Sequence, residues 1–290
     1  MLKPFQTNKR LVELLGDRGM VIEDKSFAEL YLTKRNYYRL NVYFHKFMQN
    51  NSFEKRVSFK DIVKIEDCDS SIRHILFRYI EYIELRLRTQ IGYFIAESYG
   101  ADAFYHRNCF IHERAAEGGE FITNCRNKIF QDFHNDPVII HHNLNYAGLL
   151  PVWVTIEYIT FGNLSKLLNL IDSKIQSKIA SNFGIKSNIL KNWIQSLVVI
   201  RNLCAHHNSL FRTSLRIRPA ILHKHSSLGL VNGIFANIYC IFQLLTDSER
   251  ARFKREIGYL TISIDELKGN CYKLKIGDYG FPANWDRYLT

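Results

Sequence analysis

Turn-forming residues are scarce in this sequence, whose 290 residues include only 5 prolines and 15 glycines. A β-sandwich needs many tight turns, and proline and glycine form most of them, so such a fold is not indicated. Long uninterrupted segments are expected instead, and these are usually helices. Apolar residues make up 47% and charged residues 23%, as in a soluble globular protein with one large domain or two small ones.

Paired cysteines are missing as well. The six cysteines are scattered without a Cys-x-x-Cys pair, so neither a disulfide framework nor a zinc ribbon is indicated, and reduced thiols in a cytoplasm fit best. The N-terminus, Met1-Leu2-Lys3-Pro4, lacks the apolar core of a signal peptide. The histidines between residues 106 and 142 lack metal-ligand spacing, so we expect no bound metal and no cofactor.

A charge-free stretch from His225 to Thr246 has about the length of a membrane span. It also contains Ser226, Asn232 and Gln243, which lower its hydrophobicity below that of a typical span. We therefore predict a buried core helix here and no membrane partner.

Acidic residues are absent from residues 173–246, a window of 74 residues. The formal net charge of the chain is +11, and nine cations lie in this window: Lys174, Lys178, Lys186, Lys191, Arg201, Arg212, Arg216, Arg218 and Lys224. Solvated surfaces normally interleave both signs, so the window favours an anionic partner, nucleic acid above all. A basic surface without a partner is the alternative.

Helical periodicity is strongest from Ile72 to Tyr99, where apolar residues recur three and four positions apart and Gly100 follows as a cap. Ser58 before Asp61 has the pattern of a helix start, and Glu84 and Arg88 are spaced to pair.

Further helices are predicted from Pro151, with a break at residues 161–163, and from Ser187. The aromatic tail, residues 277–285, is expected to dock on the body. We predict an all-α protein, with an N-terminal helical subdomain in residues 1–65 and a helical domain with its docking tail in residues 66–290.

The helix predicted from residue 188 is apolar on nearly all faces, so it must be buried in a core or between subunits. Arg201 in such a place needs a desolvated anion or a carboxylate, with Glu81 and Glu84 as candidates. Asn202 and His206 are four apart and share a face, whereas Arg201 and His206 lie about 140° apart around the helix.

A site that uses both Arg201 and His206 therefore needs one of three arrangements. These are a long bent arginine side chain, a helix that ends near His206, or a second copy of the chain across a two-fold axis. The last suits a buried apolar helix and predicts a homodimer.

The segment Arg201-Asn202-Leu203-Cys204-Ala205-His206 resembles the Arg-polar-x-x-x-His signature of HEPN ribonucleases, and its extension through His207-Asn208 resembles family members. Four other stretches resemble the Abi-type abortive-infection proteins, a branch of that superfamily that includes the AbiD and AbiF types. They are Asn36-Tyr37-Tyr38-Arg39-Leu40 with Tyr43, Ile83-Glu84-Leu85-Arg86-Leu87-Arg88-Thr89, Pro151-Val152-Trp153 with Phe161-Gly162-Asn163-Leu164-Ser165, and Gly280-Phe281-Pro282 with Asn284-Trp285.

The resemblance implies a HEPN-like helical bundle, dimerisation that brings two motifs together, and metal-independent endoribonuclease activity in defence against phage. RNA carries its own nucleophile, the 2′-hydroxyl, so no metal is required. In this scheme His206 is the general acid or base, Arg201 braces the phosphate, and Asn202 orients His206 or the phosphate. Products ending in a 2′,3′-cyclic phosphate and a 5′-hydroxyl are expected. The auxiliary candidates are His207, as a second acid–base group or a structural residue, and Glu84.

Candidate RNA-binding cations are Lys191, Arg212, Arg216, Arg218, Lys224 and Arg39. A regulatory RNA or a protein antitoxin is a further expected partner. No tyrosine follows shortly after His206, so silencing by nucleotidylation, known for some HEPN toxins, is not indicated. Two other classes remain open: a non-catalytic RNA-binding or regulatory module of the same fold, and a structural protein in which Arg201 pairs with Glu84.

Overall fold

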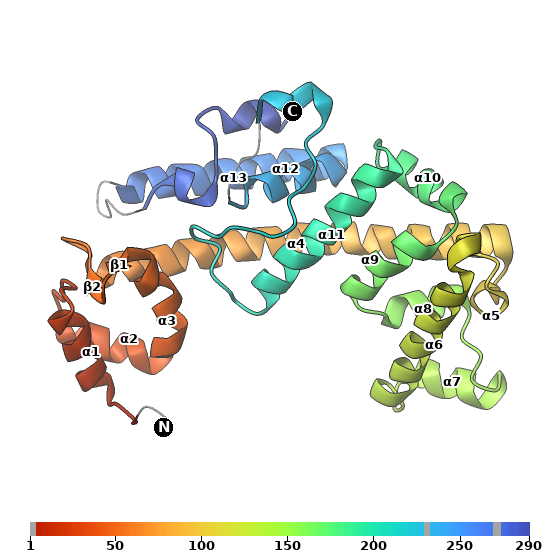
Figure 1. Ribbon diagram of the computed structural model, residues 1–290, viewed down its shortest axis with the longest axis horizontal. Coiled ribbons are helices and arrows are strands. Elements are labelled where there is room, and N and C mark those ends of the chain that lie inside the picture. The colour runs from red at the N-terminus through yellow and green to blue at the C-terminus, as the bar shows by residue number, and fades with distance from the viewer. Residues whose placement is uncertain (1–3, 229–232, 269–273) are drawn as a thin grey trace. The chain divides into compact units, whose positions relative to one another are not determined.

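The computed structural model describes residues 4–228, 233–268 and 274–290. Helices dominate these residues, which confirms the predicted all-α class (Figure 1). The strands among them form a short antiparallel hairpin, β1 (Met48–Gln49) and β2 (Ser52–Phe53). No helix among the described residues is long and apolar enough to cross a membrane.

The chain divides into two compact units. The first comprises Met1–Phe77, Asn202–Arg216 and Ile221–Thr290, and the second comprises Arg78–Arg201 and Ile217–Ala220. Two of the four boundaries fall inside helices, one of them in α4 and the other between Arg201 and Asn202 of the motif. The subdomain boundary after residue 65 stays a prediction.

The first unit contains the first part of the long helix α4 and the helices that precede it or come late in the chain. Its elements are α1 (Asn8–Asp17), α2 (Lys25–Lys34), α3 (Tyr37–Phe44), η1 (His45–Phe47), the hairpin, the first part of α4 (Phe59–Tyr99), η3 (His223–Leu228), α12 (Phe235–Leu244), α13 (Asp247–Lys268), η4 (Ile276–Tyr279) and η5 (Trp285–Tyr288). Side-chain oxygens of Thr7, Asp24 and Asn36 accept backbone N–H groups at the starts of α1, α2 and α3. Such caps stabilise helices that are too short to persist alone.

Helix α4 begins where the sequence predicts a cap. The Ser58 N–H donates to Asp61 Oδ2 at 3.0 Å, and the Asp61 N–H donates to Ser58 Oγ at 3.1 Å, a reciprocal capping box. Gly100, with φ of 89°, follows its last residue in the left-handed conformation that glycine adopts without strain. The helix is longer than the segment predicted from Ile72 because its apolar spacing already starts at residue 62.

Helix α12 is the core helix of the first unit, since all ten of its side chains are buried. The prediction of a buried helix within His225–Thr246 is confirmed for this part, whereas residues 229–232 lie outside the described residues. The C-terminal segment packs on the same core. The ring centroids of Phe281 and Phe235 are 4.9 Å apart, and those of Tyr279 and Phe211 are 5.8 Å apart.

The second unit is helical throughout its described regular structure. Its elements are the second part of α4, α5 (Ala103–His106), η2 (His112–Arg114), α6 (Ala115–Asp132), α7 (Pro137–Asn145), α8 (Val152–Tyr158), α9 (Phe161–Leu170), α10 (Ser173–Asn182) and α11 (Ser187–Ala205) as far as Arg201. The break predicted at residues 161–163 comes earlier, at Ile159 and Thr160. The Thr160 hydroxyl accepts the Asn163 N–H at 3.2 Å and so caps α9 at that point.

Candidate functional site

The motif ends helix α11 in a tight turn. The His206 N–H still donates to the Asn202 carbonyl at 3.0 Å, as in a helix. The Asn208 N–H then reaches back to the Leu203 carbonyl at 2.8 Å, and the His207 N–H donates to the Cys204 carbonyl at 3.0 Å. These two bonds define a Schellman turn, so the helix stops immediately after His206.

His207 occupies the left-handed position of this turn, with φ of 55°. Glycine is the usual residue there because a side chain strains this backbone conformation. The backbone of His207 therefore has a structural role in the turn that ends α11.

Replacing His207 with glycine should raise the free energy of unfolding by about 1 kcal/mol, because the left-handed strain is removed. Urea denaturation measures the change. His207→Ala is the matched control, since it removes the imidazole and keeps the strain. A destabilised glycine variant would show that the imidazole itself holds the turn.

The outward face of α11 is a regular stripe. Asn188, Gln195, Asn202 and His206 are exposed, and their seven- and four-residue spacing places them on one side of the helix. Of the two predicted surroundings of this helix, burial on all faces in the core of one chain is therefore wrong for this face, whereas burial between subunits stays a prediction. Arg201 is half-buried.

Three arrangements could join Arg201 to His206, and one of them is a helix that ends near His206. The structure has this helix end, but the end does not by itself bring the two side chains together. His206 keeps its helical hydrogen bond and hence a helical position. At about 100° per residue, Arg201 then remains about 140° away around the axis.

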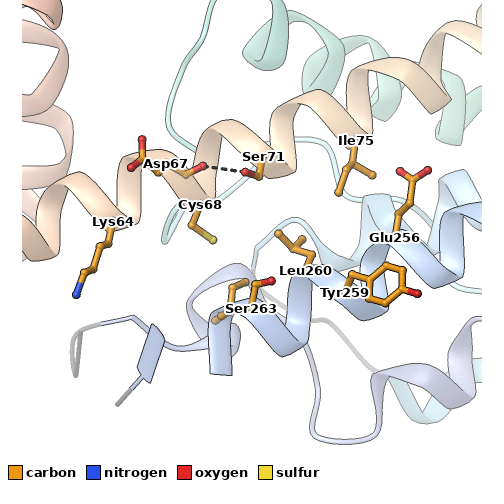
Figure 2. A pocket seen from close by; sticks show the side chains of 10 residues that line it. Lys64, Asp67, Cys68, Ser71, Ile75, Glu256, Tyr259, Leu260 and Ser263 are labelled. Atoms are coloured by element: carbon orange, nitrogen blue, oxygen red, sulfur yellow. Dashed lines mark hydrogen bonds between the residues drawn. The ribbon is translucent and has the colours of Figure 1, made fainter. Parts of the chain in front are cut away.

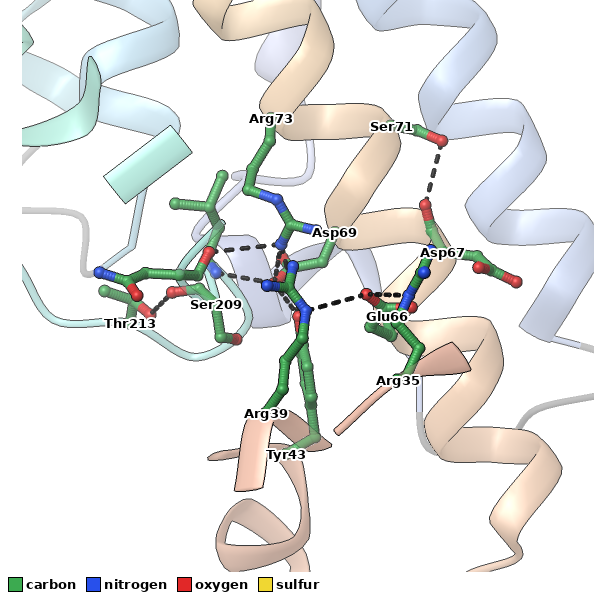
Figure 3. A network of polar contacts seen from close by, with 12 residues as sticks. Arg35, Arg39, Tyr43, Glu66, Asp67, Asp69, Ser71, Arg73, Ser209 and Thr213 are labelled. Atoms are coloured by element: carbon green, nitrogen blue, oxygen red, sulfur yellow. Dashed lines mark hydrogen bonds and ion pairs between the residues drawn. The ribbon is translucent and has the colours of Figure 1, made fainter. Parts of the chain in front are cut away.

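A buried ion pair on α4 holds the chain just beyond the motif (Figure 3). Arg73 donates to Asp69 Oδ2 at 3.2 Å, and their side chains are 4% and 0% exposed. Arg73 also donates to the Asn208 carbonyl at 3.3 Å, and the Leu210 N–H donates to Asp69 Oδ2 at 2.8 Å. The Tyr43 hydroxyl gives Asp69 Oδ2 a further hydrogen bond at 2.7 Å. We call these contacts the Asp69–Arg73 clamp.

Burial raises the pKa of Asp69, against the opposing effects of the Tyr43 hydroxyl, the Leu210 N–H and Arg73. Burial also raises the pKa of Tyr43, which keeps its phenol protonated as a donor. The clamp therefore fixes the backbone after His207 by charge-assisted bonds inside the core of the first unit.

Sequence reasoning missed the clamp, although a signal was present. Asp69 and Arg73 are four positions apart on α4. They lie in a row of buried apolar residues at helical spacing: Ile62, Ile65, Ile72 and Leu76. Two opposite charges set into an apolar stripe at helical spacing indicate a buried pair that serves another segment.

Three of the predicted RNA-binding cations contact other parts of the protein. Arg212 donates to Asp278 Oδ1 at 2.7 Å and stacks over Phe47, with its guanidinium 4.9 Å from the ring centroid. Arg39 lies 3.7 Å from the buried carboxylate of Glu66, and Lys191 donates to Gln176 at 3.1 Å.

The other three, Arg216, Arg218 and Lys224, have exposed side chains and form no ion pair within the described part of the chain. The segment that contains Arg218 and Ala220 is bound to α11 by two hydrogen bonds. The Ala220 N–H donates to the side chain of Asn192 at 2.7 Å, and the Trp193 indole donates to the Ala220 carbonyl at 2.7 Å. The basic window thus includes an extended segment fixed to the motif helix in the second unit.

Glu84 has a partner on its own helix. Its carboxylate forms an ion pair with Arg88, as the sequence predicts, and Arg88 also donates to the carbonyls of Ile156 and Glu157. This pair ties α4 to α8 within the second unit.

A cavity of about 500 Å³ lies between α4 and α13 in the first unit (Figure 2). Its charged lining is Lys64, Asp67 and Glu256, and burial raises the pKa of Asp67. Two carboxylates against one lysine do not suit an RNA phosphate, and no predicted site residue lines this cavity.

The sequence profile of the Abi-like proteins matches residues 30–212, more than half of the chain. The chain belongs to the family of Abi-like proteins. The match includes the Arg201–His206 motif and three of the four resembling stretches, while the C-terminal stretch from Gly280 lies beyond it. No curated protein and no solved structure matches the chain significantly.

Both the clamp and the motif of this Abi-like protein fall inside the matched range. The match confirms the predicted resemblance to the Abi-type proteins and points to abortive infection as the biological setting. The HEPN signature, the catalytic residues and the dimer stay predictions.

Proposed function

We propose that this Abi-like protein is a metal-independent endoribonuclease that acts in abortive infection. The observation that carries the proposal is the position of His206. Its side chain is exposed at the end of a helix, on the same face as Asn202, and the Asp69–Arg73 clamp fixes the backbone that follows it. A general acid or base must be accessible to its substrate and held in position; the exposed side chain of His206 and the fixed backbone that follows it support these two requirements.

The proposed reaction uses the nucleophile of RNA itself. The 2′-hydroxyl loses its proton to an imidazole and attacks the adjacent phosphorus, the bond to the 5′-oxygen of the next nucleotide breaks, and that oxygen takes up a proton. The products are a 2′,3′-cyclic phosphate and a 5′-hydroxyl. Arg201 stabilises the negative charge that builds on the phosphate oxygens.

A second copy of the chain supplies the missing geometry. Arg201 and His206 lie on different sides of one helix, so a site that uses both joins Arg201 of one copy to His206 of the other. Val198, Val199 and Leu203, which flank the exposed stripe, are only half-buried in a single chain, and dimerisation about α11 covers them.

An RNA-binding module without catalysis is the second candidate function. Arg216, Arg218 and Lys224 favour it, because they are exposed, form no ion pair with any residue that the structure describes, and can contact phosphates without any chemistry. Under this alternative the chain binds RNA and does not cut it.

The full-length protein is expected to cut RNA in the presence of a chelator, because the proposed reaction uses no metal. End-group analysis of the cut RNA should find the 2′,3′-cyclic phosphate. An RNA that lacks the 2′-hydroxyl at the cleavage position should remain intact. A requirement for added Mg²⁺, or equal cutting of DNA, contradicts the mechanism; binding without cutting supports the second candidate.

A further inference from the structure

A cavity of about 620 Å³ lies in the second unit between α5, the end of α7 and the residues that lead into α8. Its volume is within the range of about 300–1,000 Å³ that is usual for small-molecule sites. Most of its lining residues carry a ring: Tyr105, His106, His141, His142, Tyr146 and Trp153. Walls made of rings are complementary to a flat aromatic ligand.

Large apolar surfaces are left in water at this cavity. The exposed fractions of Tyr146, Leu149 and Trp153 are 53%, 52% and 51%. Apolar side chains that gather in a concave place and remain half-exposed mark a binding site, since covering them with a ligand is favourable.

The wall is preorganised by hydrogen bonds. The Leu150 N–H donates to the Tyr105 hydroxyl at 2.7 Å, and the Arg126 guanidinium lies 4.2 Å from the centroid of the Tyr105 ring. His142 Nδ1 lies 3.1 Å from the Leu149 carbonyl. A carbonyl only accepts, so this nitrogen carries the proton, and in the neutral imidazole Nε2 of His142 is an acceptor.

Asp102 and His106 form a second fixed pair, with Nε2 of the histidine 2.9 Å from the carboxylate. The hydrogen bond from His106 lowers the pKa of Asp102, so the carboxylate is ionised. A phosphate inside the cavity would meet this negative charge, whereas a ring with N–H donors finds acceptors on Asp102 and His142.

We propose that this cavity binds a purine base that carries an exocyclic amino group, stacked against Trp153 and Tyr146 with the amino group donating to His142 Nε2. The base belongs either to a free nucleotide or to an unpaired position of an RNA strand. None of these residues belongs to the Arg201–His206 motif, so the site does not depend on the proposed ribonuclease activity.

Tryptophan fluorescence of the full-length Trp285→Phe variant tests the site. Trp153 is then the half-exposed reporter, because Trp193 is 0% exposed. Adenosine should quench the emission saturably, and purine riboside, which lacks the amino group and hence one hydrogen bond, should bind about tenfold more weakly. AMP should match adenosine. Tighter binding of a short oligoadenylate identifies an RNA strand as the source, and equal binding identifies the free nucleotide.

Tyr146→Ala should weaken adenosine binding about tenfold or more, since one stacking partner is lost. Tyr38→Ala, which removes a tyrosine that is 83% exposed and lies outside the cavity, is the matched control and should bind normally. If Tyr146→Ala does not fold by circular dichroism, His142→Ala serves instead and should erase the preference for adenosine over purine riboside. Absence of saturable quenching, or equal quenching by choline, would overturn the proposal.

Discussion

Replacing His206 with alanine should lower the rate of RNA cleavage by about 10²–10⁴-fold, the usual contribution of a general acid or base. RNA affinity should stay within about twofold of the wild type, because the cations of the basic window are unchanged. Cleavage is measured by single-turnover assays on a labelled RNA, and binding by filter retention with the variant in excess.

His223→Ala is the matched control for this substitution. His223 is also exposed and lies in the basic window but outside the motif, so the control should cut RNA at the wild-type rate. Growth arrest on expression, scored with and without phage, should follow the cleavage rates. Undiminished cleavage by the His206 variant would refute the assignment of His206, and loss of RNA binding would point to a role in phosphate contact.

Asp69→Asn should reduce the free energy of unfolding by about 3–5 kcal/mol. The substitution keeps the size of the side chain and removes its charge, which leaves the guanidinium of Arg73 buried without a carboxylate. The cost is large because burial of an unpaired charge is unfavourable in a medium of low polarity. Urea denaturation followed by circular dichroism measures the change.

Asp67→Asn is the control for Asp69→Asn, since it makes the same chemical change on the same helix at a position that is far more exposed than the fully buried Asp69. Its stability should stay within about 0.5 kcal/mol of the wild type. Adding Arg73→Met to Asp69→Asn should recover part of the loss, because the unpaired charge is then removed. Equal stabilities of the two aspartate variants would show that the Asp69–Arg73 clamp is not a stabilising pair.

The clamp also links stability to the proposed activity. Asp69 and Arg73 contact the backbone of residues 208 and 210, directly after the motif. The Asp69 variant should therefore cut RNA more slowly than the wild type even at temperatures at which it is fully folded, because the turn after His206 is held less firmly.

Local sequence determined the helical elements. The Ser58–Asp61 capping box, the glycine after Tyr99, the pairing of Glu84 with Arg88 and the apolar helix α12 were all predicted, and the structure confirms them. Each depends on residues close together in the chain, whose geometry follows from helical periodicity and capping. The motif, too, is visible in six consecutive residues.

Tertiary structure alone decided which charged side chains form ion pairs or hydrogen bonds with other parts of the protein. Arg212 and Arg39 look like free cations in the sequence, yet folding places Asp278 beside the first and Glu66 beside the second. Likewise, Asp69 meets the Leu210 N–H across 141 residues of chain. Local periodicity does not encode such partners. They depend on which segments pack against one another, and on the free energy that is lost when a buried charge has no partner.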